Sequence, residues 1–184
     1  INSLFHAITF HLSSFHPMKK ILLLSDTHGY IDESILRHVS EADEVWHAGD
    51  IGNISVADQI SRLKPLKAVY GNIDDDKVRI TFPEHQYFNC EGLKVLMIHI
   101  AGNPGKYNPQ VKNLLGKFPA DVLICGHSHL LKVVRDGANH LHINPGAAGI
   151  HGFHKVRTLI RFKIDSGKMK ELDVIELGER SRSA

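Results

Sequence analysis

Seven side chains of types that bind metal ions lie just beyond short apolar segments of the chain. They are Asp26, His28, Asp50, Asn72, His99, His127 and His129. Glycines stand next to several of them, and a glycine lets the backbone turn sharply and approach a bound group closely. A single residue of this kind is more often a turn former, a helix cap or a hydrogen-bonded buried histidine. Seven of them at five segment ends are hard to explain by turn chemistry, so we expect a metal site.

The donor set suits two divalent cations better than one structural or sensing zinc ion. Seven ligands exceed the four of a tetrahedral zinc site, and neither Cys90 nor Cys125 belongs to the set. Carboxylate, imidazole and amide donors suit Mn, Fe, Ni or Zn. Two such ions about 3.5–4 Å apart, bridged by a carboxylate and a hydroxide, are a common apparatus for phosphate ester hydrolysis. With only two carboxylates among its ligands, this centre would stay positively charged and attract a phosphodiester anion.

The first part of the chain, residues 18–70, alternates between strand and helix patterns. Continuous apolar runs are typical of strands buried on both faces, and apolar side chains three and four residues apart indicate helices. The expected strands are 20–25, 44–48 and 66–70, and the expected helices are 31–40 and 55–63, with Ser55 as the N-cap of the second. This order predicts a parallel sheet that is covered by helices.

The second part is predicted to be mostly antiparallel. Extended structure is expected over 78–90, further strands over 93–98, 121–125, 130–135, 140–143, 155–164 and 169–176, and a helix over 108–118. Turn signals such as Asp136-Gly137 join the later strands. Ligands of open α/β sheets bind beyond the carboxyl ends of the strands. Five strand ends are therefore expected to bring the seven residues to one edge.

Composition indicates one globular domain and gives no sign of a polyanionic partner. The chain has 184 residues, 42% of them hydrophobic and 23% charged, and a formal charge of only +2. Two cysteines cannot form a disulfide framework, which favours a cytoplasmic location. Residues 1–17 have no basic start and no unbroken apolar stretch, so we interpret them as a non-native or disordered leader. The domain is expected to cover 18–178, with a frayed tail over 179–184.

The motifs that hold the seven residues resemble those of a known family. In order and spacing, Asp26-x-His28, Gly49-Asp50, Gly71-Asn72, His99 and Gly126-His127-x-His129 resemble the calcineurin-like metallophosphoesterases. The short length and Asn144-Pro145-Gly146 are similar to the small YfcE-type phosphodiesterases, over about residues 18–176. This resemblance implies an α/β fold, a four-layer sandwich of two mixed β-sheets flanked by helices, with strands parallel in the first half and antiparallel in the second.

The resemblance also implies a role for each residue. Asp26, His28 and His129 would bind one metal ion, Asn72, His99 and His127 the other, and Asp50 would bridge them. Asp50, Asn72 and His99 would be the catalytic residues, and a hydroxide between the metals would attack phosphorus in line. The implied cofactors are two divalent ions, Mn in the cell with Ni, Fe or Zn as alternatives. The implied partners are a small phosphodiester, for example a nucleotide, and further copies of the chain in a dimer or tetramer.

Two positions depart from the family pattern. Many relatives have a histidine that assists the leaving group where this chain has Ile73, and a second histidine next to the position of His99. Since general acid catalysis typically contributes about 10²–10⁴-fold, we expect slow hydrolysis of monoesters and faster hydrolysis of diesters. Asp74 is expected to orient a group near the site or to cap a turn. The segment 102–109, with Lys106 and Tyr107, is expected to be a solvated loop that could also shape a substrate pocket.

The other histidines and a different function remain open at this point. Trp46, His47 and Cys125 are expected in the core, and His38, His85, His140 and His142 on the faces of ordinary elements, whereas the loop with His151 and His154 could reach the site. The alternative to an enzyme is a non-catalytic protein-binding scaffold of the same fold, similar to a retromer subunit. Such a chain is expected to lose metal ligands, so the intact set favours the enzyme.

Overall fold

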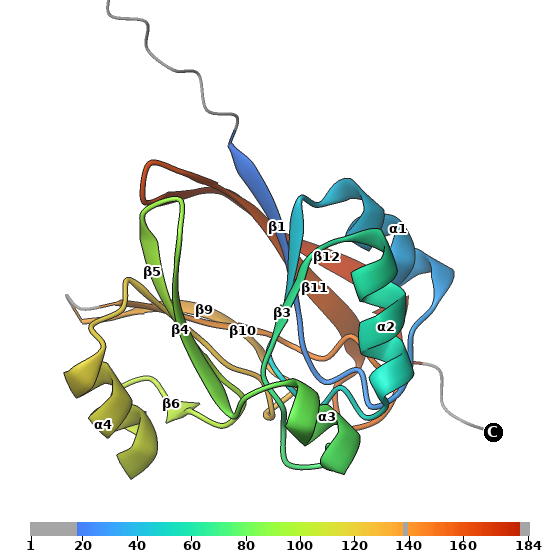
Figure 1. The fold of residues 1–184 in the computed structure, drawn as a ribbon, viewed down its shortest axis with the longest axis horizontal. Coiled ribbons are helices and arrows are strands. Elements are labelled where there is room, and N and C mark those ends of the chain that lie inside the picture. The colour runs from blue at the N-terminus through green and yellow to red at the C-terminus, as the bar shows by residue number, and fades with distance from the viewer. Residues whose placement is uncertain (1–17, 138–139, 181–184) are drawn as a thin grey trace, which may run out of the picture.

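The computed structural model describes residues 18–137 and 140–180, arranged as two facing β-sheets with helices on their outer sides (Figure 1). The predicted leader, 1–17, lies outside the described residues. The first sheet has the strand order β12-β11-β1-β2-β3, and the second the order β4-β5-β8-β10-β9. The two mixed sheets of the structure confirm the predicted α/β sandwich.

The strands and helices have the following bounds. The first sheet contains β1 (Lys19–Leu24), β2 (Glu44–His47), β3 (Leu66–Ala68), β11 (Val156–Asp165) and β12 (Lys168–Glu179). The second contains β4 (His85–Cys90), β5 (Leu93–Ile98), β8 (Val122–Ile124), β9 (Leu131–Asp136) and β10 (His140–Pro145). The helices are α1 (Glu33–Glu41), α2 (Ile54–Leu63), α3 (Asp76–Thr81) and α4 (Pro109–Lys117), and β6 (Gly102–Asn103) pairs with β7 (Lys106–Tyr107) in a small hairpin.

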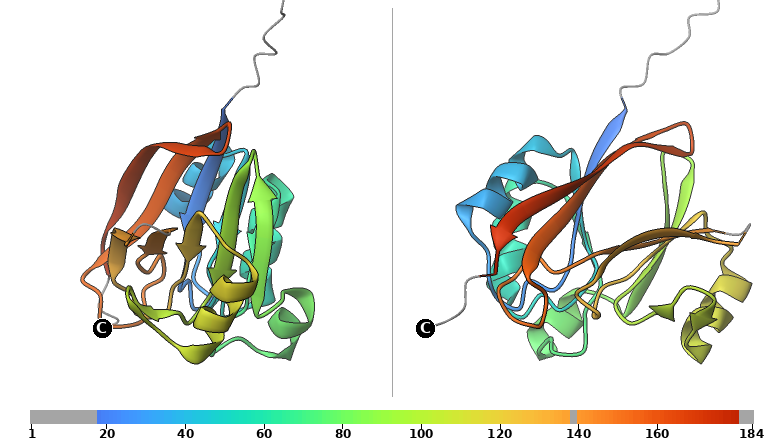
Figure 2. Two further views of the ribbon diagram at one scale, coloured as in Figure 1. Left: turned by 90° about the vertical axis from the view of Figure 1, so that its left-hand side faces the viewer. Right: turned by 180° about the vertical axis from the view of Figure 1, so that it is seen from behind.

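Alternation along the buried strands produces the layers. In β1, Ile21 and Leu23 belong to the core between the two sheets, whereas Leu22 and Leu24 belong to the core under α1 and α2. Successive side chains of a strand point to opposite faces, so one apolar run serves two cores. A third core lies between the second sheet and α4, which covers the outer face of that sheet (Figure 2).

The first half of the chain pairs as predicted. Strands β1, β2 and β3 are parallel, and α1 and α2 are the connections between them. The N-cap of α2 is Asn53 rather than Ser55, because the Asn53 side chain accepts a hydrogen bond from the backbone N–H of Ser55. In the second half most pairs are antiparallel, although β8 is parallel to both β5 and β10.

The structure corrects the prediction in several places. The segment predicted as extended over 78–90 begins with α3, whose N-cap Asp75 accepts a hydrogen bond from Val78 N. The five strand ends belong to two facing sheets rather than to one edge. The domain also runs past 178, because β12 ends at Glu179 and Arg180 N donates to Lys155 O. No helix in the described part of the chain is long and apolar enough to cross a membrane.

Candidate metal centre

The loops that carry the predicted ligands meet where the ends of the two sheets converge. The loops after β1 and β2 are joined by two backbone hydrogen bonds, Asp26 N to Gly49 O and His28 N to Asp50 O, both 3.0 Å long. Across the sandwich, His127 N donates to both carboxylate oxygens of Asp26, at 3.2 and 3.1 Å. The first and second sheets therefore both supply residues to one site.

Five of the seven predicted ligands have a left-handed backbone conformation. Their φ angles are 55° at Asp26, 50° at His28, 52° at Asp50, 67° at His127 and 57° at His129. A residue with a Cβ atom pays about 1 kcal/mol or more for this conformation, and such residues collect at functional sites. The surrounding structure holds these side chains in strained positions that aim them at one another.

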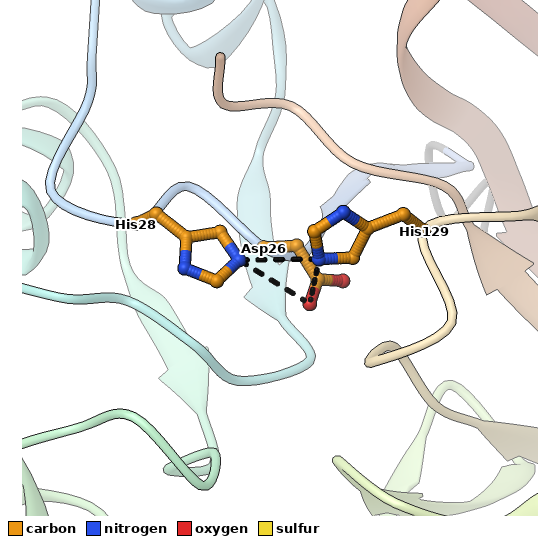
Figure 3. A group of neighbouring side chains, drawn as sticks. All are labelled: Asp26, His28 and His129. Carbon is orange, nitrogen blue, oxygen red and sulfur yellow. Dashed lines mark hydrogen bonds and ion pairs between the residues drawn. The ribbon is translucent and has the colours of Figure 1, made fainter. Parts of the chain in front are cut away.

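The first cluster consists of Asp26, His28 and His129 (Figure 3). The Nε2 atoms of the two histidines are 3.1 Å apart. Asp26 Oδ1 lies 3.3 Å from Nε2 of His129 and 4.0 Å from Nε2 of His28. The Asp26 side chain is buried, and both rings are partly buried. Three donor atoms converge on a point that one cation could occupy.

His154 determines which nitrogen of His129 faces this cluster. His154 Nε2 lies 3.0 Å from Gly149 O, so it carries the hydrogen and donates it to that carbonyl. His154 Nδ1 is then an acceptor, and it lies 3.3 Å from His129 Nδ1. His129 therefore donates from Nδ1 and presents the lone pair of Nε2 to the cluster. Metal-binding histidines are commonly oriented by a second hydrogen bond of this kind.

The second cluster consists of Asp50, His99 and His127. The His99 Nδ1–H donates to Ala48 O at 2.8 Å, which leaves a lone pair on the buried Nε2. That atom has no hydrogen-bond partner among the described residues and lies 3.2 Å from Asp50 Oδ1. Two acceptors at this distance repel each other unless a proton or a cation lies between them. The ligand atoms of this cluster therefore suit a cation.

Electrostatics in the second cluster favour positive charge. Burial by itself lowers the pKa of His99, but the carboxylates of Asp50 and Asp26 outweigh it and raise that pKa above its usual value. Burial likewise raises the pKa of Asp50, but the adjacent His99 imidazole and the hydrogen bond from Ile73 N outweigh it and lower that pKa. The two carboxylates thus stabilise a proton on His99, and their negative charge would stabilise a bound divalent cation in the same way.

Asn72, the remaining predicted ligand, lies on an exposed loop beside His99. The two residues line one cavity of about 390 Å³. Ile73 N donates to Asp50 Oδ1 at 3.1 Å, which fixes this loop against the Asp50 carboxylate. A Cβ atom at Gly71 would collide with the same carboxylate, so only glycine allows the loop so close.

Asp74 and Arg79 hold the Asn72 loop in place. The Asp74 carboxylate accepts from Ile51 N, Gly52 N and Gly71 N at 3.2, 2.6 and 2.7 Å, so it joins the loops that carry Asp50 and Asn72. Arg79 donates to the carbonyls of Gly71, Asn72 and Asp74 at 3.1, 3.0 and 2.7 Å. Asp74 thus acts as the sequence suggested, whereas Arg79 was missed because it lies on α3, where a strand was expected.

His47 supports the Asp50 loop from inside the core. Gly49 N donates to His47 Nδ1 at 3.2 Å, so the hydrogen is on Nε2, which lies 2.9 Å from Thr27 Oγ1. The Thr27 hydroxyl donates in turn to Ile51 O at 3.0 Å. Burial lowers the pKa of His47 to about 4 and keeps the ring neutral. Trp46 and Cys125 are buried in the core as predicted.

The remaining histidines expected on ordinary helices and strands lie there, and two of them are buried. His140 and His142 are buried, and both lie against the hydroxyl of Tyr107, at 3.0 and 3.3 Å. Tyr107 is therefore a core residue of the 102–109 segment, whereas its neighbour Lys106 is exposed as a solvated loop predicts. His38 and His85 are half-buried on their elements.

The Gly146–His154 loop does reach the site, as the sequence allowed. His154 contacts the ring of His129, and the exposed His151 ring lies 6.2 Å from that of His28, centroid to centroid. The glycine-rich composition of the loop was the signal for this approach, because a Cβ atom at Gly152 would collide with the His129 ring.

Comparison with known proteins assigns the fold and the family together. Residues 18–167 match the model of the calcineurin-like phosphoesterase superfamily domain. The chain belongs to this superfamily. It is 27% identical over 161 residues to a probable metallophosphoesterase of Methanothermobacter thermautotrophicus, covering 85% of this chain and 91% of that one. The superfamily uses divalent metal ions, which agrees with the two clusters.

Solved structures share the fold at low sequence identity. A "predicted phosphoesterase" from Streptococcus pneumoniae has a TM-score of 0.67 and 21% identity, covering 88% of this chain and 91% of that one. Wild-type Vps29 from Entamoeba histolytica, solved in complex with Zn²⁺, has a TM-score of 0.62 and 16% identity, covering 85% and 98%. This calcineurin-like chain is thus a metallophosphoesterase by family, with a mixed α/β sandwich.

Proposed function

We propose that this metallophosphoesterase is a phosphodiesterase that uses two divalent cations, Mn by preference and otherwise Ni, Fe or Zn. The observation that carries the proposal is the position of Asp50 between the two clusters. Its Oδ1 lies 3.2 Å from His99 Nε2 and its Oδ2 lies 3.8 Å from His28 Nε2. One carboxylate with an oxygen toward each cluster is the arrangement that a bridging ligand requires.

The residues of the chain divide the task between them. The first cation would be held by Asp26, His28 and His129 and the second by Asn72, His99 and His127, with Asp50 shared. When bound, two such cations supply a nucleophilic water at neutral pH and neutralise charge on the phosphoryl oxygens. The side chains of His99 and His129 are held in the required tautomer by Ala48 O and by His154. The exposed His127 marks the side that a substrate can approach.

The preference for diesters rests on Ile73. Its backbone N–H contacts Asp50, and its side chain is 46% exposed, so it lies at the edge of the site. An isoleucine cannot donate a proton to a leaving group. A substrate whose leaving group departs as a stable anion needs no such donor, so activated diesters should react faster than monoesters of basic alcohols.

The test is to remove metal from the protein and assay a nitrophenyl diester beside the matching monoester. Adding Mn, Ni, Zn or Mg back should restore cleavage of the diester, with the monoester slower, and two ions should bind per chain. The variant Asp50→Asn should lose this cleavage, and Asp58→Asn, at an exposed position of α2, is its matched control. Stoichiometric binding of two ions without cleavage of any diester would contradict the proposal.

The second candidate function is a protein-binding scaffold, which the fold likeness to Vps29 supports. The complete set of ligand side chains favours the enzyme, because a scaffold has no need of an open, reactive centre. If two ions bind and no ester is hydrolysed, the scaffold becomes the better interpretation.

A further inference from the structure

A small cavity of about 220 Å³ shares His127 with the second cluster. Its walls come from the Gly126-His127-Ser128 loop, from residues 100–103 and from the facing sides of β9 and β10. A group bound at His127 can therefore extend into the cavity without leaving the site. The polar side chains that line the cavity are Asn103, Ser128, Lys132, His142 and Asn144.

Lys132 brings a positive charge to this cavity. Its ammonium group donates to Asn103 Oδ1 at 3.2 Å and forms no ion pair with a carboxylate in the described part of the chain. His142, in the same wall, is neutral, since burial and then the charge of Lys132 lower its pKa to about 4. The positive charge of the Lys132 ammonium group in this cavity is therefore not neutralised.

Ser128 adds a hydrogen-bond donor. Its Oγ accepts from Leu130 N at 3.3 Å and from Asn144 Nδ2 at 3.1 Å. A hydroxyl group has two acceptor sites and one hydrogen. With both acceptor sites in use, the hydrogen of Ser128 is left to point toward an acceptor in the cavity. Lys132 and Ser128 together would bind an anionic oxygen.

The larger cavity, which His99 and Asn72 line, does not offer a free cation to a ligand. It contains Arg79, but three backbone carbonyls and the ring of Tyr70, 4.5 Å away, already surround that guanidinium. Glu84 in the same wall adds negative charge. Of these two cavities beside the metal centre, only the one at Lys132 offers a cation to a ligand.

We propose that the Lys132 cavity binds a second anionic group of the substrate, a carboxylate or a terminal phosphate, while the scissile phosphodiester lies at the metal centre. This inference rests on the proposed function. The volume is below the roughly 300–1,000 Å³ of drug-sized ligand sites. It suits a small anionic group of a few atoms. The preferred substrate is thus a diester that carries a further negative charge near the scissile phosphorus.

Three nitrophenyl phosphodiesters test the proposal. They have the same leaving group, and their other ester group is butyl, 3-carboxypropyl or 4-phosphobutyl. With the Mn-loaded protein, kcat/KM should be about tenfold higher for one or both charged esters than for the butyl ester, which is the effect of one charge-assisted hydrogen bond. The charged ester that gains more identifies the anion. Lys132→Met should reduce that ratio toward one, and Lys132→Arg should keep most of it.

The control is Lys94→Met, an exposed lysine at the opposite end of β5 from His99, which should leave the ratio unchanged. Equal kcat/KM for all three esters, or a preference that survives Lys132→Met, would overturn the proposal. Failure to cleave any ester would instead count against the phosphodiesterase. The cavity is then tested by calorimetry with phosphonate analogues of the same esters, where the charged analogues should bind about tenfold more tightly than the butyl one.

Discussion

The two clusters of the candidate metal centre differ in the hydrogen bonds that orient their histidine rings. In the first, His129 is braced by His154, which is in turn braced by the Gly149 carbonyl. In the second, His99 is braced by the Ala48 carbonyl, whereas the exposed His127 ring has no hydrogen bond among the described residues. Both histidines of the first cluster are partly buried, whereas the second cluster opens through the exposed His127 onto the cavity with Lys132.

This difference suggests a division of work between an anchoring position and a reacting position. A ligand held by a chain of hydrogen bonds loses little freedom when a metal binds, so the first cluster should bind its ion more tightly. An exposed ligand such as His127 leaves room for a substrate oxygen. Asp50 and Asp26 lie close to histidines of both clusters and couple the two positions.

The largest effect is expected for Asp50→Asn, which removes the charge shared by the clusters. Diesterase activity should fall by about a thousandfold, and the amount of bound metal should fall with it. The measurement is kcat/KM for the nitrophenyl diester together with metal content per chain. Asp58→Asn should leave both unchanged, and retained activity in Asp50→Asn would exclude the bridging role.

Two buried, neutral histidines should also make stability depend on pH. His47 and His142 are neutral in the folded protein because burial lowers the pKa of each to about 4, against 6.5 in the unfolded chain. Between these values the unfolded chain binds more protons, so the free energy of unfolding is highest above pH 6.5 and decreases as the pH falls toward 4. Each such histidine accounts for about 3 kcal/mol over this window.

Urea unfolding at several pH values measures this dependence. His142→Gln should flatten the decrease, because it removes one of the groups that binds a proton only on unfolding. His151→Gln, at an exposed position, is the control and should keep the slope of the original protein. A free energy of unfolding that does not change between pH 6.5 and 4 would contradict the assignment of these two histidines as neutral.

The anchoring role of the first cluster is tested by His154→Ala. Loss of a hydrogen bond behind a metal ligand typically lowers metal affinity about 10–100-fold. Calorimetric titration should show this loss in one of two binding steps, with the other step unchanged. Phe153→Ala changes a fully exposed side chain of the same loop and should alter neither step. Equal weakening of both steps would mean that His154 supports the fold in general.

The smallest effect is expected where the second cluster meets the substrate, in Ile73→His. A proton donor at this position should raise the ratio of monoester to diester cleavage by about tenfold, below the usual range for general acid catalysis because the imidazole would not be preorganised. The matched control is Ile80→His on α3, where the side chain is 86% exposed. An unchanged ratio in Ile73→His would refute this account of the diester preference.

Much of the fold could be predicted because it depends on local patterns. The apolar runs of β1 and β5 and the capped helices α1 and α4 carry their signals within a few residues. The region of α3 could not be read in this way. The helix has only six residues, and its amphipathic pattern is too short to outweigh the β-branched residues that suggested a strand.

The candidate site shows the same limit. Its predicted ligands could be named because they follow strands and several of them stand next to a glycine. Their supports could not, since His154 and His129 are 25 residues apart and Lys132 gains its significance only from the cavity it lines. Side chains such as these have ordinary sequence neighbours, and no local pattern marks them.

By itself, the sequence of this chain determined the order of most elements, the chemical types of the seven predicted ligands and the family. These follow from the period of apolar residues and from side-chain chemistry, which are local properties. Only the tertiary structure decided that the predicted ligands come from two facing sheets. It also decided which ring nitrogen of His99 and His129 faces its cluster, and which cavity contains an ammonium group without a carboxylate partner. Those properties depend on distances between segments that are far apart in the chain, and packing alone sets these distances.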